Sequence, residues 1–280
     1  MINILSPLEW KAIKINLFIR SFFHRDEIMM EAQQDLDFLT LSIMVSVIFL
    51  LAGTIKGTLG VGLPTTSVSV MALFLPPKIA IALVVFPILV TPFRQFFNAP
   101  NRKPVAIEFR YMGFAIFITL ALTTIFTARL ESEQIRMVIG FAIILFCLTS
   151  YAFPNYHLPT RGDSFFQLFF GSLSGVMGGL TSIWAPPLVI YLIGKNADRE
   201  TFITAAGFLF SVGSIPLLIG FWANGMLSLD LGMLSMLCII PTLVGFRIGE
   251  LVRHKLSAKL FRKAVLLAFL AAGLRLIWLD

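Results

Sequence analysis

The residues best suited to chemistry form a glycine-rich run that contains one lysine. The run reads Gly53-Thr-Ile-Lys-Gly-Thr-Leu-Gly-Val-Gly-Leu-Pro64 and lies between two apolar stretches, 41–49 and 68–75. A charge at bilayer depth costs at least about 2.5–3.5 kcal/mol, so Lys56 is a candidate binding residue. The alternative is a lysine whose ammonium extends to the membrane interface. The other candidates supply a backbone that glycine allows to turn sharply, and hydroxyl donors: Gly57, Gly60, Gly62, Thr65 and Thr66.

Pro64 indicates where a second half-helix begins in this segment. The missing N–H of proline does no harm in the first turn of a helix, where that group has no partner. The start of a helix carries a partial positive charge and free N–H groups, which suit an anion. The sequence therefore predicts an anion-binding helix end in the middle of an apolar segment.

The same pattern recurs in the second half of the chain. Gly53, Gly57 and Gly60 are followed 118 residues later by Gly171, Gly175 and Gly178. A broken apolar segment in each half predicts a substrate site near the bilayer midplane, although glycines four residues apart also serve close helix packing. The second copy adds these candidate residues: Gly175, Gly178, Gly179, Thr181, Ser182 and Trp184, ahead of Pro186 and Pro187.

The remaining charges favour an anion over a metal or a proton relay. Arg94 follows Pro87 and Pro92; it either points into the same cavity or anchors the cytoplasmic end of its helix. All fifteen acidic residues lie in loops, tails or near span ends, whereas a nickel or cobalt site would use His and carboxylate ligands. Cys147 and Cys238 lie in apolar stretches and are expected to be core residues. No catalytic motif occurs, so we expect neither an enzyme nor a cofactor.

Composition places these residues in a polytopic α-helical membrane protein. The chain has 280 residues, of which 58% are hydrophobic and only 13% charged, against about a quarter charged in soluble domains. The mean hydropathy is +0.89. A β-barrel would show short segments of alternating polarity instead. The net charge of +7 is interpreted as basic cytoplasmic loops and not as a nucleic-acid surface.

A bilayer helix needs about 20 mostly apolar residues, and eight apolar elements are expected. The first half, 38–153, holds 38–75, 79–97, 110–128 and 134–153. The second half, 154–280, holds 165–193, 201–222, 229–252 and 258–279. Residues 1–37 are predicted to be an extension with an amphipathic helix, lying on the membrane surface or packed on the spans.

Loop charges predict that the two halves are inverted. The loop with Arg102, Lys103 and Arg110 is expected in the cytoplasm, as is the basic segment that begins at Arg253, whereas the uncharged loop 223–228 is expected outside. Each broken element must then enter and leave on one side, as a helical hairpin. Both chain termini are expected outside the membrane.

The glycine motifs resemble the sulfite exporter TauE/SafE family, also called the toluene sulfonate uptake permease family. The likeness rests on the run 53–64 followed by Pro76-Pro-Lys-Ile-Ala80, on the second copy 171–187, and on two later segments, Pro241-Thr-Leu-Val-Gly245 with Gly249 and Phe261-Arg-Lys with Gly273-Leu. It covers about residue 38 to the C-terminus. The resemblance implies two four-helix halves that move sulfite or organosulfur anions across the inner membrane. The chain differs from the family at Val61 and Leu63, where small residues are common, and in having Trp184 near the proline pair.

We therefore predict a transporter that moves sulfite or a small organosulfonate across a bacterial-type inner membrane, by export. It would work by alternating access around the two glycine-rich breaks. Its expected partners are the small sulfur-containing anion and the lipid bilayer, without nucleic acid; the sequence leaves a homo-oligomer open. The alternatives are a membrane scaffold or assembly protein and, less favoured, a transition-metal permease.

Overall fold

The computed structural model describes residues 38–152, 157–159 and 161–253, together with 270, 273, 274, 276 and 277. The predicted amphipathic helix in 1–37 and nearly all of the last predicted span, 258–279, lie outside the described residues. The chain divides into two compact units, Met1–Val45 and Ser46–Asp280. In the first unit, the described residues 38–45 form the start of a helix that continues into the second. The proposed boundaries at 37 and 153 stay predictions.

Every regular element among the described residues is a helix, which confirms the predicted all-helical class at this level. The helices of the first half are α3 (Phe38–Leu59), α4 (Leu63–Met71), α5 (Pro77–Leu83), α6 (Val85–Phe97), α7 (Arg102–Glu108), α8 (Arg110–Thr127) and α9 (Ser132–Ala152). Those of the second half are α10 (Asp163–Thr181), α11 (Ala185–Gly194), α12 (Arg199–Ala223), α13 (Leu229–Leu237) and α14 (Ile239–Val252).

Five stretches of described helix are long and apolar enough to cross a membrane: Leu41–Leu59, Pro77–Phe97, Arg110–Thr127, Arg199–Ala223 and Leu229–Val252. Four of them match predicted elements within two residues at each end. The first ends at Leu59, because the predicted element 38–75 divides into α3 and α4. The loop after residue 97 contains the short helix α7, which the sequence did not predict.

A serine from another helix supports the interruption between α5 and α6. Pro87 cannot donate a hydrogen bond to the carbonyl of Leu83, because proline lacks an N–H. The hydroxyl of Ser235 in α13 donates to that carbonyl oxygen at 2.7 Å, and it accepts from the N–H of Phe86 at 3.1 Å. The two helices thus continue as one apolar span across a kink.

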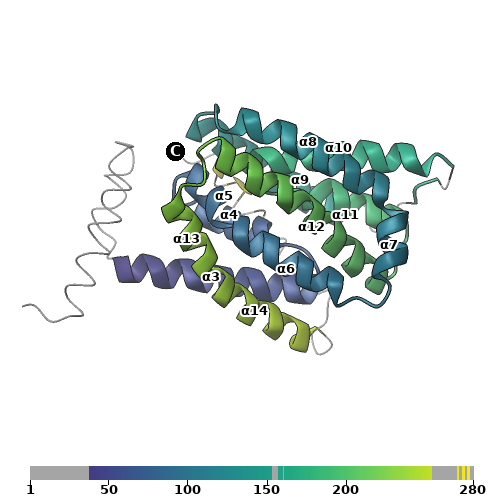
Figure 1. The fold of residues 1–280 in the computed structure, drawn as a ribbon, viewed down its shortest axis with the longest axis horizontal. Helices are drawn as coiled ribbons and strands as arrows, with labels where there is room; N and C mark the ends of the chain where they lie inside the picture. Colours follow the sequence, from purple (N-terminus) through teal and green to yellow (C-terminus); the bar gives the residue numbers. More distant parts are fainter. Residues whose placement is uncertain are drawn as a thin grey trace, which may run out of the picture. The chain divides into compact units, whose positions relative to one another are not determined.

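In the second unit, α8 packs along α10 and α12, and α12 also packs on α6 (Figure 1). Glycines bring the helix backbones close together. A Cβ on Gly171 or Gly175 would collide with α8, at Met112 and Thr119. The hydroxyls of Thr123 and Thr127 in α8 donate across this interface to the carbonyls of Gly175 and Gly179, at 3.2 and 2.7 Å.

The first half makes the corresponding contact with α14. A Cβ on Gly53 would collide with the carbonyl oxygen of Thr242, and one on Gly57 with that of Phe246. In the pair α3–α14 and in the pair α10–α8, the contacts advance in the same direction along the two helices. Each broken element therefore packs on a helix of the opposite half of the sequence, α3 on α14 and α10 on α8.

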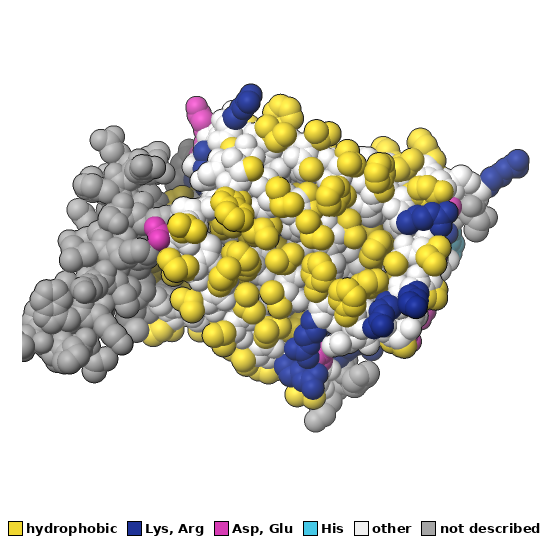
Figure 2. Space-filling model, in the orientation of Figure 1, with side chains coloured by type: hydrophobic (Ala, Val, Ile, Leu, Met, Phe, Trp, Pro, Cys, Tyr) yellow, Lys and Arg dark blue, Asp and Glu magenta, His cyan; other side chains and the backbone are white. Residues whose placement is uncertain are grey.

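The surface is apolar over a broad area, as a bilayer requires. Figure 2 shows hydrophobic side chains spread across the middle of the visible face, while Lys and Arg gather where α7 and the end of α14 lie in Figure 1. Large side chains that are more than half exposed occur on helices of both halves: Phe114, Phe126, Phe169, Ile240 and Leu251. A multi-pass membrane protein accounts for this distribution.

The glycine contacts predict a position-dependent response to the same substitution. In Gly175→Ala the new Cβ meets Thr119 and the backbone of Ile116 and Leu120, so we expect a loss of about 1–3 kcal/mol in stability from overpacking. In Gly232→Ala, also within a helix, the nearest atom is 3.8 Å away, and we expect no loss. Thermal unfolding of the detergent-solubilised protein measures both, and equal melting temperatures would contradict this packing.

Candidate functional site

Both glycine-rich segments are interrupted helices, with two residues of positive φ at the first interruption and one at the second. After α3 ends at Leu59, Gly60 has φ 84° and Gly62, which caps the start of α4, has φ 107°. Glycine adopts these angles without steric cost. After α10 ends at Thr181, Ser182 has φ 60°. A serine there is uncommon, so this second break does not depend on glycine for its left-handed residue.

The structure relates the two breaks by 122 residues, not by the 118 expected from the glycines. The offset of 122 joins the last residues of α3 and α10, the left-handed Gly60 and Ser182, and the first residues of α4 and α11. The N–H of Gly60 donates to the carbonyl of Lys56 at 2.7 Å, and that of Ser182 donates to Gly178 at 2.8 Å. The difference is about one helical turn, a slip that still aligns Gly53 and Gly57 with Gly175 and Gly179.

Neighbouring contacts repeat with the same offset. A Cβ on Gly60 would lie 3.0 Å from the side chain of Ile203, at the start of α12. The hydroxyl of Ser182 donates to the carbonyl of Ile81 in α5, at 3.3 Å. The first break thus touches α12, the helix that follows the second broken element, and the second break touches α5, which follows the first broken element.

Lys56 is fully buried on α3, one turn before the first break. It is the one Lys, Arg, Asp or Glu among the described residues that falls in the buried class. Its Nζ has no hydrogen-bond partner in the described part of the chain and lies 4.8 Å from the ring centre of Phe210. The alternative of an interface anchor would require the side chain to reach the surface, and it does not.

Trp184 brings the second break to the same ring. Its indole stacks on Phe210 with centroids 4.9 Å apart, and it fills the space left by Gly178 and Gly213. Trp184 is fully buried, and its Nε1 lacks a hydrogen-bond partner among the described residues. Phe210 of α12 therefore contacts both candidate residues, Lys56 from one break and Trp184 from the other.

The four predicted hydroxyls differ in whether they remain available. That of Thr65, in the first turn of α4, is buried and has no described partner. Thr66 and Thr181 donate to their own helices, to the carbonyls of Gly62 and Met177, both at 2.7 Å. Together with the Ser182–Ile81 bond, this leaves Thr65 as the hydroxyl of the four that can serve a ligand without losing an existing bond.

The predicted glycines also divide by what they touch. Gly57 and Gly175 lie against α14 and α8, and Gly179 also lies against α8, so close helix packing accounts for these positions. Gly178 lies against the ring of Trp184. Gly60 and Gly62 are required by their backbone angles.

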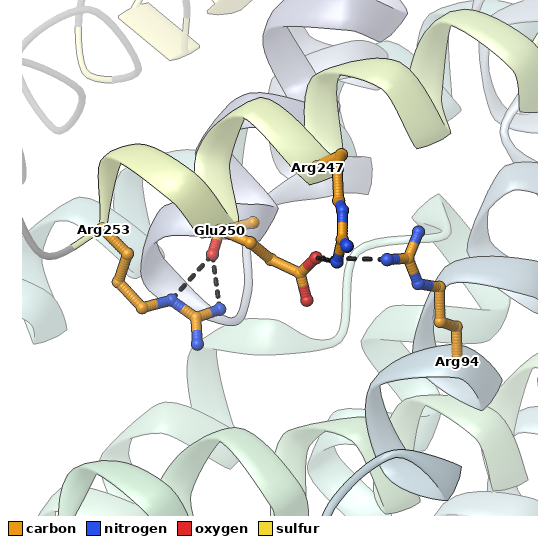
Figure 3. A network of polar contacts seen from close by, with 5 residues as sticks. Arg94, Arg247, Glu250 and Arg253 are labelled. Carbon is orange, nitrogen blue, oxygen red and sulfur yellow. Dashed lines mark hydrogen bonds and ion pairs between the residues drawn. The ribbon is translucent and has the colours of Figure 1, made fainter.

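Arg94 belongs to an ion-pair network at the end of α14 (Figure 3). Its Nη2 lies 3.2 Å from the Glu250 carboxylate, which Arg247 also contacts at 3.1 Å, and its guanidinium covers the ring of Phe246 at 5.5 Å. The side chain is 30% exposed. These contacts are with α14, and none of them joins Arg94 to Lys56. They agree with the alternative in which Arg94 anchors the end of its helix.

Arg253, beside this network, stabilises the end of α3. Its Nε donates to the carbonyl of Gly57 at 2.9 Å, and its Nη2 donates to the same oxygen. Burial and the nearby Arg199 lower the pKa of the Arg253 guanidinium, while Glu250 opposes the shift. The arginine thus satisfies a carbonyl in the last turn of the helix, where no intrahelical donor is available.

Gln95 of α6 is a site residue that the sequence analysis missed. Its Nε2 donates to the carbonyls of Gly60 and Ile203, at 3.2 and 2.5 Å, and so joins the first break to α12. Its Oε1 is buried without a described partner. A glutamine in an apolar span is a weak signal by itself, but polar residues inside a membrane segment are generally functional.

The candidate residues around the two breaks offer hydrogen-bond donors and no carboxylate. The described residues contain no group of three or more His, Cys, Asp or Glu that could hold a metal ion. The unpaired atoms contributed by Lys56, Thr65 and Trp184 can all donate hydrogen bonds. Buried donors of this kind are normally paired, so an acceptor ligand would complete them.

In a comparison with protein-family models, residues 45–276 match the sulfite exporter TauE/SafE model. Searches of curated proteins and of solved structures found no match. The matched range includes both interrupted helices, Lys56, Phe210 and Trp184. Because the match spans most of the sequence, the chain belongs to the sulfite exporter TauE/SafE family, a family of membrane transporters.

Proposed function

We propose that this protein moves sulfite or a small organosulfonate anion across the inner membrane, by export, through alternating access around its two helix breaks. The observation that carries the proposal is a set of buried donors from both breaks that have no partner among the described residues: Nζ of Lys56, Oγ1 of Thr65 and Nε1 of Trp184. A sulfite or sulfonate group presents several oxygen acceptors on one centre. It could therefore accept from all three donors and balance the lysine charge.

The start of α4 adds backbone donors to this set. The first turn of a helix leaves N–H groups without intrahelical partners, and the helix dipole favours negative charge there. Leu63 and Thr65 provide such N–H groups directly after the break. Non-helical backbone at membrane depth is tolerated where it lines a binding cavity or is buried in protein.

Alternating access would use an inverted relation between the halves. In support, the breaks and their contacts with Ile203 and Ile81 recur 122 residues apart. The two ends of the second broken element also meet, because Lys195, after α11, lies 3.1 Å from Asp163, at the start of α10. We propose that both broken elements are hairpins that enter and leave on one side, with both termini outside.

Energetics favour export. The cytoplasm is electrically negative, so each negative charge that leaves gains about 2.3 kcal/mol per 100 mV. A carrier of this kind would need no proton-coupling carboxylate in its centre. The site proposed here uses none, since Lys56 is the buried charge.

A membrane scaffold is the second candidate, and the helix contacts of Gly57 and Gly175 favour it. Close packing explains those glycines without any ligand. It does not explain why Lys56 and Trp184 are buried with unpaired donors on one ring. A scaffold would show no thermal stabilisation by any sulfur anion, whereas a transporter should be stabilised by its substrate.

Lys56→Met should abolish most transport while leaving the fold intact. Loss of a buried charge partner weakens binding by about 2–5 kcal/mol, which is roughly thirtyfold or more, whereas an apolar side chain in place of an unpaired buried charge is neutral or stabilising. Sulfite and methanesulfonate flux into proteoliposomes measures the effect. Lys103→Met, on the exposed surface of α7, is the matched control, and unchanged flux in Lys56→Met would refute the site.

Trp184→Phe should weaken binding without disturbing the stack on Phe210. The change removes the indole N–H but keeps an aromatic ring, and a hydrogen bond to a charged group contributes about 1.5–3 kcal/mol. We expect KM for the transported anion to rise by about tenfold or more, with little change in melting temperature. Trp222→Phe provides the control, because Trp222 is 69% exposed; an equal rise of KM in both variants would remove Trp184 from the site.

A further inference from the structure

The two breaks differ in how many hydrogen-bond donors and charges they supply. At the first, Lys56 brings a full charge, Thr65 a hydroxyl, and α4 the N–H groups of Leu63 and Thr65. At the second, Pro186 and Pro187 occupy the first turn of α11, and each removes one N–H that could face an anion. Trp184 provides one uncharged N–H there.

The position equivalent to Lys56 carries no charge. With the offset of 122 it is Gly178, and the space beside it is filled by the ring of Trp184. Phe210 thus contacts an ammonium from one half and an indole from the other. Two described arginines on this side of the structure already have partners, since Arg94 pairs with Glu250 and Arg253 donates to the carbonyl of Gly57.

We propose that this site selects singly charged anions and discriminates against doubly charged ones of the same shape. The inference rests on the proposed function, because it assumes that the anion binds at Lys56, and it implies that sulfite would bind there as singly charged hydrogensulfite. One buried ammonium balances one negative charge. A second negative charge would be buried without a cationic partner, and an uncompensated charge in an apolar interior is strongly disfavoured.

Three tetrahedral anions of similar size separate charge from shape. Sulfate carries two negative charges at neutral pH, whereas sulfamate and methanesulfonate carry one. Sulfamate keeps a polar group in place of the fourth oxygen, and methanesulfonate has an apolar one, so the pair also controls for contact with a methyl group. Binding of each is measured on the full-length protein in detergent by thermal shift and by titration calorimetry at one ionic strength.

Both monoanions are expected to bind at least tenfold more tightly than sulfate, and Lys56→Met should lose that binding. Equal affinity for sulfate and sulfamate, with both weakened in Lys56→Met, would overturn the charge selection but keep the site. Absence of binding by all three anions would overturn the proposed function as well. A monoanion preference that survives in Lys56→Met would refute the assignment of charge selection to this lysine.

The melting temperature of Lys56→Met shows whether the variant is folded. If the variant unfolds, Lys56→Gln, which retains polarity and nearly the same length, replaces it, with the same expected loss of monoanion binding. Lys103→Met should bind all three anions as the unaltered protein does, because Lys103 is exposed on α7.

Discussion

A buried positive charge without an acidic partner among the described residues is the main constraint on this structure. Lys56 is fully buried, and its Nζ lies over the face of Phe210, 4.8 Å from the ring centre. A desolvated cation–π contact contributes about 2 kcal/mol, while the effective cost of burying an ion is several kcal/mol. The aromatic ring therefore offsets only part of the cost. The remainder is the physical argument for the anion that we propose at this lysine, and the unpaired donors of Thr65 and Trp184 fit the same proposal.

Close helix packing holds both broken elements in place. Gly53 and Gly57 allow α3 to lie directly on α14, and Gly171 and Gly175 do the same for α10 on α8. Threonine hydroxyls of α8 add hydrogen bonds across the second contact. The paired helices form a frame in which the breaks can carry irregular backbone, and Gln95 ties one of them to α12. Glycine thus has two separate functions here, contact between helices and turning of the chain.

The two breaks have similar backbone geometry but different side chains around them. Equivalent helix ends, left-handed residues and N-terminal prolines recur 122 residues apart. Within that framework a lysine stands on one side and a glycine with a tryptophan ring on the other. One break is rich in donors and charge, whereas prolines make the other poor in N–H groups. The two breaks thus share a backbone pattern but supply different charges and hydrogen-bond donors.

Hydropathy and turn residues predicted most of the elements. The spans 110–128, 201–222 and 229–252 appear as α8, α12 and the pair α13–α14, because long apolar runs have few structures available in a bilayer. The helix starting at Leu63 follows from Pro64, as predicted. The short helix α7 was missed, since its seven residues include a proline and charges and carry no membrane signal. Arg94 was left with two interpretations, and its contacts place it with Glu250.

Sequence alone determined the membrane class, the family resemblance and the candidate lysine, because hydropathy, glycine spacing and an isolated charge are local properties. The register between the halves was decided by tertiary structure. Glycine spacing favoured 118, which pairs three glycines, whereas the offset of 122 pairs only Gly53 and Gly57 with Gly175 and Gly179. Packing also decided that Phe210 lies between Lys56 and Trp184. A phenylalanine in an apolar span carries no signal of its own, and only the crossing of α12 with both breaks gives it a role.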